Sequence, residues 1–187
     1  MIRSFLFCFG LFYLNLTYCQ ENSFDVRINA YAELPYNDES IELINGWEAG
    51  GRFSKNSNVS SGFYINITNF SPSFTVHRAI GAGADFQFFL FDWIIFQPYL
   101  NFGGNYFRVR AQGSTTYFGM QSPITFKIDE SSHGFKAFGR VGTLFNISGE
   151  QEDFFIDLSV GWNRHLHRNY FRDLSSFGLN LGLMYRF

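Results

Sequence analysis

The chain of 187 residues contains little of what usually holds a secreted domain together, with two cysteines and four prolines. Both cysteines, Cys8 and Cys19, lie in an N-terminal segment that we expect to be removed, so the remainder has no disulfide framework. Beyond that segment, no window offers the ~20 consecutive apolar residues of a membrane-spanning helix. The formal net charge of -2 is nearly neutral and argues against nucleic acid as a partner.

The first 19 residues have the three parts of a secretory signal peptide. A positive start over 1–3 precedes an apolar run from Phe5 to Leu14, and a more polar stretch ends at Cys19. We expect cleavage after Cys19, with cleavage after Gln20 as the alternative. Lipid attachment at Cys19 is disfavoured by the bulky residue before it. The mature chain, 20–187, then has the length of one domain.

The C-terminal segment 177–187 alternates in a way that is typical of a membrane β-strand. Bulky apolar side chains occupy every second position: Phe177, Leu179, Leu181, Leu183, Tyr185 and Phe187. With its terminal aromatic residue, this segment resembles the last strand of the small OmpA/OmpX-type outer-membrane β-barrels. The resemblance implies an eight-stranded antiparallel up-and-down transmembrane β-barrel in the outer membrane of a Gram-negative cell. It also implies that Leu179, Leu181, Leu183, Tyr185 and Phe187 are read by the barrel assembly machinery.

Period-2 segments recur along the whole mature chain, with turn-forming residues between them. We predict strands over 24–34, 41–53, 63–68, 74–90, 94–106, 134–147, 153–165 and 177–187. An even number of strands places both termini on one side, which in the resembling family is the periplasm. The long connections 35–40, 111–132 and 167–173 then lie outside, and the second of these is expected to form a projecting hairpin. The turn at 54–58 is long for the periplasmic side, and Pro98 predicts a bulge or an unpaired donor.

Alternation alone does not decide which face is inward, because a soluble lipocalin-like barrel has the same period. About five bulky apolar side chains on each of eight strands exceed what the interior of an eight-stranded barrel holds. The opposite face is rich in Gly, Asn, Ser and Arg, and the chain has only three Lys against 11 Arg, unlike a solvated surface. We therefore predict that the apolar face contacts lipid.

With this orientation, charged side chains of both signs fill the lumen. The acids are Asp25, Glu33, Glu42, Glu48, Asp85 and Asp157, and the bases are Arg27, Arg52, Lys136, Arg140 and Arg186. Isolated buried charges cost several kcal/mol, so nearly equal numbers predict a paired network that plugs the barrel. A selectivity filter and a catalytic carboxylate cluster are the alternatives, and both are disfavoured because eight strands leave no aqueous channel.

Two further groups of side chains are assigned by position. We expect interfacial anchors among the amphipathic aromatic residues Trp47, Trp93, Trp162, Tyr106 and Tyr185. The four histidines, His77, His133, His165 and His167, are expected at the extracellular rim, exposed to water. His165 and His167 share a strand face, which is a weak signal for a metal site. We predict no metal and no cofactor.

The sequence favours a monomeric, non-enzymatic outer-membrane protein with a structural, adhesion or partner-binding role carried by its extracellular loops. The partner on either side of the membrane is not identifiable from the sequence. The alternatives are a narrow channel or transport barrel and an accessory barrel of a secretion system. A lipid A modifying enzyme is less favoured, since no His-x-Ser strand motif occurs: His77 is followed by Arg78-Ala79.

Overall fold

The computed structural model describes residues 23–37, 41–56, 58–72, 76–91, 95–118, 123–149, 153–167 and 173–187, with the backbone alone at 55–56, 71–72, 76, 111–118 and 123–130. Outside these ranges lie the predicted leader, 1–19, the predicted anchor Trp93 and most of the connection 167–173. Among the described residues, no helix is long and apolar enough to cross a membrane.

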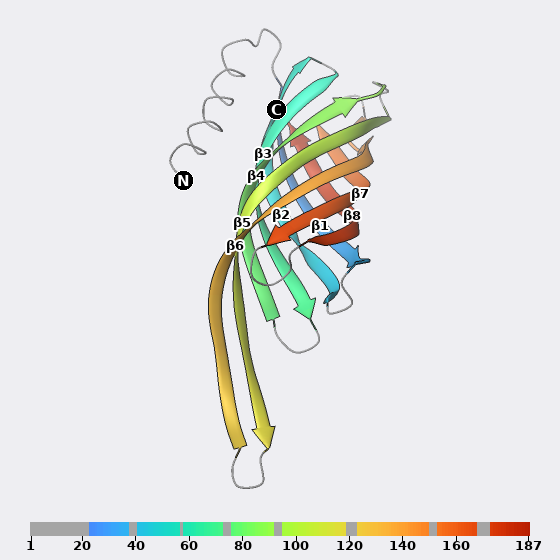
Figure 1. The fold of residues 1–187 in the computed structure, drawn as a ribbon. Helices are drawn as coiled ribbons and strands as arrows, with labels where there is room; N and C mark the ends of the chain where they lie inside the picture. The colour runs from blue at the N-terminus through green and yellow to red at the C-terminus, as the bar shows by residue number, and fades with distance from the viewer. Residues whose placement is uncertain are drawn as a thin grey trace.

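Eight antiparallel strands close into a barrel in which each strand pairs with its neighbours in sequence and β1 pairs with β8 (Figure 1). Their bounds are β1 Ser23–Pro35, β2 Ile41–Asn56, β3 Val59–Pro72, β4 Val76–Phe89, β5 Phe96–Phe118, β6 Pro123–Asn146, β7 Phe154–His167 and β8 Leu174–Arg186. The predicted up-and-down topology is therefore confirmed. The backbone N–H of Phe187 donates to the carbonyl of Phe24 at 2.9 Å, so the start of β1 and the C-terminus lie at the same end. We call this the terminal end and the opposite one the hairpin end.

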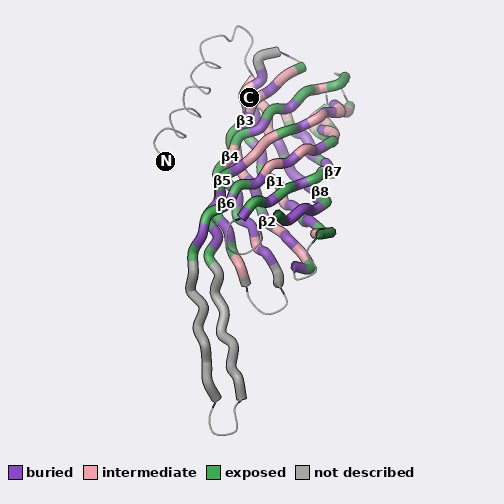
Figure 2. The backbone as a smooth tube through the Cα atoms, in the orientation of Figure 1, coloured by how far each residue is buried: buried purple, intermediate pink, exposed green. Residues whose placement is uncertain are grey.

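Exposure alternates along each strand as the period-2 pattern predicts (Figure 2). On β1, Asp25, Arg27 and Asn29 are buried, whereas Val26 and Ile28 are exposed. The exposed set runs round the barrel and consists mainly of Ile, Leu, Val and Phe, so the apolar belt covers the outside of the barrel. A solvated barrel would bury this face, and the soluble lipocalin-like alternative is therefore wrong.

The start of β2 departs from the prediction. The register of β2 against β3 shifts between Ile41 and Leu43, which reverses the alternation there. Ile41 and Ile44 turn into the lumen and Glu42 is exposed. The expectation that Glu42 faces inward is wrong for this reason.

Several predicted strand ends also differ. β2 and β3 extend until Asn56 pairs with Val59, so the connection predicted to be long is a tight turn. β4 ends at Phe89 and β5 begins at Phe96, so the turn near residue 92 is longer than predicted. The pairing of Pro98 with Thr143 runs without a register shift, so no bulge forms there.

The largest difference is the length of β5 and β6, predicted to end at 106 and to begin at 134. They pair continuously from Phe96↔Phe145 to Phe118↔Pro123 and form a hairpin that projects far beyond the rest of the barrel (Figure 1). The ends predicted for these two strands, at 106 and 134, coincide with the end of the apolar face. A strand outside the hydrocarbon region needs no apolar face, so the hairpin predicted within 111–132 is continuous with the barrel strands.

Candidate functional site

The lumen holds most of the charged residues that the sequence places inside the barrel. Asp25, Arg27, Glu48, Arg52, Asp85, Lys136, Arg140 and Asp157 are all buried, and Arg186 is partly buried at the terminal end. Because these side chains come from six different strands, their partners are set by the closure of the barrel and not by neighbours in sequence.

Asp85 on β4 is the acceptor at the centre of the largest cluster. Its Oδ2 accepts hydrogen bonds from Arg27 at 2.5 Å, from Arg52 at 3.1 Å and from the Asn101 amide at 3.1 Å. Two guanidinium groups thus share one carboxylate away from bulk water. Gly62 makes room for it, since a Cβ there would lie 2.6 Å from Asp85 Oδ1.

A second ion pair spans the lumen between opposite strands. Arg140 on β6 donates to both carboxylate oxygens of Glu48 on β2, at 2.9 and 3.2 Å. The amide of Asn29 on β1 donates to Glu48 Oε1 at 3.0 Å. The fork of the guanidinium matches the carboxylate, which is the strongest geometry for such a pair.

Glu33 on β1 organises the lumen toward the hairpin end. Its carboxylate accepts from the Lys136 ammonium and from the Ser176 hydroxyl, the latter at 2.7 Å. His165 Nε2 lies 2.8 Å from Glu33 Oε2. The expectation that the histidines line a water-exposed rim is wrong for His165 and His167, which are 1 % and 2 % exposed, because both face inward near the end of β7. His133 is exposed, as predicted.

Two polar contacts complete the lumen toward the terminal end. The Tyr99 hydroxyl donates to Asp157, and Arg186 donates to Asp25 Oδ1 at 3.0 Å. Among the described residues, no group of three or more His, Cys, Asp or Glu side chains has the arrangement of a metal site.

Apolar side chains that the sequence pattern did not single out are buried near both ends of the lumen. One buried cluster lies toward the hairpin end and comprises Ile41, Ile44, Phe70, Ala79, Phe107, Val109 and Leu174. The other lies toward the terminal end and comprises Tyr99, Leu144, Phe155 and Met184, with Phe89 against it. Except at the β2 irregularity, these residues share the parity of the inward polar residues on their strands, and that signal would have found them.

Three of the aromatic residues predicted as anchors, Trp47, Tyr106 and Trp162, face outward. Trp47 is 63 % exposed, and Tyr106 and Trp162 are also exposed. The Trp162 indole N–H donates to the Tyr36 hydroxyl at 2.8 Å, and the Tyr36 ring lies 5.2 Å from that of Phe177. Amphipathic rings joined in this way fit the boundary between hydrocarbon and water.

The hairpin leaves the barrel because its two strands outrun their neighbours. β4 stops pairing with β5 at Val76↔Gln112, and β7 stops pairing with β6 at Gly134↔His167. From there to the tip at Phe118↔Pro123, the two strands pair with each other. In the part of the chain that the structure describes, no further strand lies along either edge.

Comparison with known proteins finds the same fold at low sequence identity. Neisserial surface protein A matches with a TM-score of 0.57 and 16 % identity over 89 % of this chain and 100 % of that one. Ail, the attachment invasion locus protein of Yersinia pestis, gives 0.54 and 16 % over 90 % and 100 %. The outer membrane protein OprG from Pseudomonas aeruginosa gives 0.52 and 10 % over 90 % and 97 %. No family model and no curated protein matches the chain.

The chain therefore has the fold of the small outer-membrane β-barrels, and the resemblance seen in its last strand is confirmed at the level of fold. The exposed apolar belt gives that fold the outer surface of an outer-membrane protein.

Proposed function

We propose that the chain is an integral outer-membrane protein that uses a plugged, non-catalytic barrel as an anchor for the β5–β6 hairpin, and that this hairpin binds an extended protein segment outside the cell. The observation that carries the proposal is the pairing of β5 and β6 with each other alone over 113–118 and 123–128.

A two-stranded ribbon is marginally stable by itself in water and presents unpaired backbone N–H and C=O groups along both edges. Such an edge is a template for strand addition, in which a partner forms main-chain hydrogen bonds and neighbouring side chains set specificity. β6 offers the longer edge, because its pairing with β7 begins only at Gly134.

The barrel supports this role by holding the base of the hairpin, where β5 pairs with β4 and β6 pairs with β7. We take both termini to lie in the periplasm, as the resemblance implies, and the hairpin at the opposite end of the barrel then extends outside the cell. Ail shares the fold and is named for attachment and invasion, and this likeness of fold is the reason for including adhesion in the proposal.

The test compares the intact chain with one in which residues 114–127 are replaced by Asn-Gly. Gly113 pairs directly with Ile128, so a two-residue turn closes the shortened hairpin without changing the register.

Both chains carry a photo-crosslinking benzoylphenylalanine at Gln112, and further intact chains carry it at successive positions from Ser114 to Phe118. We expect a discrete protein adduct at the hairpin positions of the intact chain. The lipid-facing position Ile65 is the control. The absence of any hairpin adduct, or the same adduct from Ile65, would contradict partner binding.

A proline scan over 124–127 tests the mode of binding. Successive backbone N–H groups of a strand point to opposite edges, so proline at alternate positions removes a donor from the open edge and leaves the ladder with β5 intact. We expect the adduct to weaken with a two-residue period. Equal effects at all four positions would exclude strand addition.

A further inference from the structure

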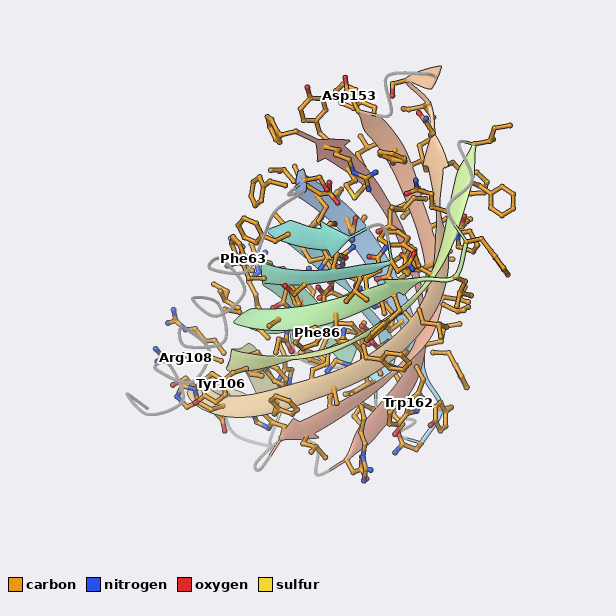
Figure 3. The ribbon with its side chains drawn as sticks, turned by 90° about the horizontal axis from the view of Figure 1, so that it is seen from above. Phe63, Phe86, Tyr106, Arg108, Asp153 and Trp162 are labelled. Carbon is orange, nitrogen blue, oxygen red and sulfur yellow. The ribbon has the colours of Figure 1, made fainter. Side chains whose placement is uncertain are left out.

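The longer edge of the β5–β6 hairpin has a definite length. β6 begins at Pro123, and its pairing with β7 begins only at Gly134, so over 123–133 its one strand partner among the described residues is β5. The hairpin leaves the barrel beyond Tyr106 and Arg108, which lie near one another at one edge of the barrel in Figure 3. We call the backbone of 123–133, on the side away from β5, the open edge.

A second copy of the chain offers this edge a strand that is already formed. A two-stranded ribbon is marginally stable in water, and additional strands are needed for independent stability. Because the second copy is extended before it binds, it loses less conformational entropy than a disordered peptide would. Two open edges joined together give a four-stranded sheet in the order β5, β6, β6, β5, in which both copies have their open edge paired.

Symmetry restricts how two copies can pair along the open edge. Two identical edges related by a two-fold axis perpendicular to the sheet run antiparallel, and residues directly opposite each other lie on the same face of the sheet. Because successive residues of a strand alternate between faces, opposite residues differ by an even number of positions or are the same residue. The axis therefore passes at a residue and not between two residues.

The sequence of the open edge fits one of these axes. Ile128 lies at the midpoint of 123–133, so an axis at this residue pairs the whole open edge with its copy. The same axis places Lys127 of each copy opposite Asp129 of the other. Opposite charges directly across a sheet are favourable, whereas an axis one residue away would oppose Lys127 to itself or Asp129 to itself. The length of the open edge and its charges therefore select the same register.

We propose that the open edge binds the open edge of a second copy, antiparallel and centred on Ile128, and that the two barrels then lie in facing membranes. Antiparallel pairing puts the barrels at opposite ends of the joined hairpins, so the chain bridges two cells. With a rise of about 3.4 Å per residue, the two Gly134 positions, where β7 joins β6, stand roughly 40 Å apart. This inference rests on the proposed function, strand addition at the hairpin, and names the partner.

The test uses the mature chain in phosphatidylcholine nanodiscs carrying either a donor or an acceptor dye, and energy transfer between the dyes measures the association of two discs. We expect discs with the unmodified chain to associate. Lys127→Glu opposes two acids, and Asp129→Lys opposes two bases. Each variant alone should associate at least about tenfold more weakly, because two cross-strand pairs turn from attraction to repulsion. A mixture of the two variants restores opposite charges at both pairs and should associate like the unmodified chain.

Cysteine cross-linking tests the register. Residues 20–187 contain no cysteine, so introduced ones are the only thiols. Thr125 of one copy should lie opposite Ser131 of the other, and oxidation should link discs carrying Thr125→Cys to discs carrying Ser131→Cys. Discs that all carry Thr125→Cys are the matched control, because antiparallel pairing holds these two positions about 20 Å apart along the strands. A link in this control and none in the mixed pair would show parallel pairing and contradict the proposal.

Three further outcomes would overturn the proposal. Discs with the unmodified chain do not associate, the mixture of charge variants associates no better than either variant alone, or the chain with the shortened hairpin associates as well as the intact chain. An unchanged unfolding midpoint in detergent verifies that each variant is folded. A hairpin adduct to a different protein, with no association of discs, would support the proposed function and refute pairing between copies, so the two tests fail separately.

Discussion

Arg140 of β6 holds both carboxylate oxygens of Glu48 on β2, the strand that stands opposite it in the closed order of the barrel. The two side chains, one from each side of the barrel, therefore meet across the lumen. A second ion pair, between Arg27 on β1 and Asp85 on β4, also crosses the interior. The interior of this barrel is held together by pairs across its width as well as by the ladder around its wall.

Removing the charge of Asp85 should destabilise the barrel. Asp85→Asn leaves Arg27 and Arg52 buried without their common carboxylate, and we expect a loss of about 3 kcal/mol or more in the free energy of unfolding. Denaturant titration in detergent micelles, followed by tryptophan fluorescence, measures it. Asn101→Ala removes one neutral donor from the same carboxylate and should cost about 1 kcal/mol. Equal losses in the two variants would contradict the account of this cluster.

Glu33 and Lys136 should behave as a coupled pair. Glu33→Gln leaves a buried ammonium beside a neutral amide and is expected to cost about 3 kcal/mol. Adding Lys136→Met removes the stranded charge, so the double variant should be more stable than Glu33→Gln alone. The same titration tests this expectation. Additive losses would show that the two side chains do not stabilise each other.

The barrel should not conduct ions. The cross-lumen pairs lie in the interior, and the apolar clusters around Phe70 and Phe155 are packed inside it toward its two ends. Purified protein in planar bilayers should give no conductance steps at high protein load. Reproducible steps that Glu48→Ala enlarges would instead assign the lumen to a transport pathway.

The C-terminal aromatic residue should matter more for assembly in cells than for stability. The Phe187 ring packs on Tyr185 with centroids 4.6 Å apart, at the edge of the barrel. If the last strand is read by the assembly machinery, Phe187→Ser should reduce the amount of folded protein in the outer membrane while refolding from urea into detergent changes little. Phe177→Ser, at an exposed outward position of the same strand, is the control. Equal reduction by both variants would remove the special role of the terminus.

The period-2 pattern predicted the eight strands, their order and the face of nearly every inward residue, because alternation in a barrel wall follows directly from backbone geometry. It failed at Glu42, where a register shift reverses the faces without any change in the local pattern. It also stopped β5 at Tyr106, since the apolar signal reports the membrane and not the strand.

The sequence did not predict which side chains pair with each other inside the lumen. Arg27 and Glu48 both face inward, but their partners lie on strands far away in the chain, and the closure of the barrel decides which side chains meet. The burial of His165 against Phe70 also follows from the closure of the barrel. Their ring centroids lie 5.6 Å apart, and the contact joins β7 to β3.

The apolar face of the barrel meets lipid while the polar face fills the lumen, and spin labels on one strand distinguish these two environments. Labels are placed at Leu181 and Asn180, neighbours on β8 with opposite burial, and their collision rates with oxygen and with a water-soluble nickel chelate are compared in lipid vesicles. We expect that the label at Leu181 collides often with oxygen and rarely with the chelate, and that the label at Asn180 is poorly accessible to both. Free access of the chelate to Leu181 would contradict it.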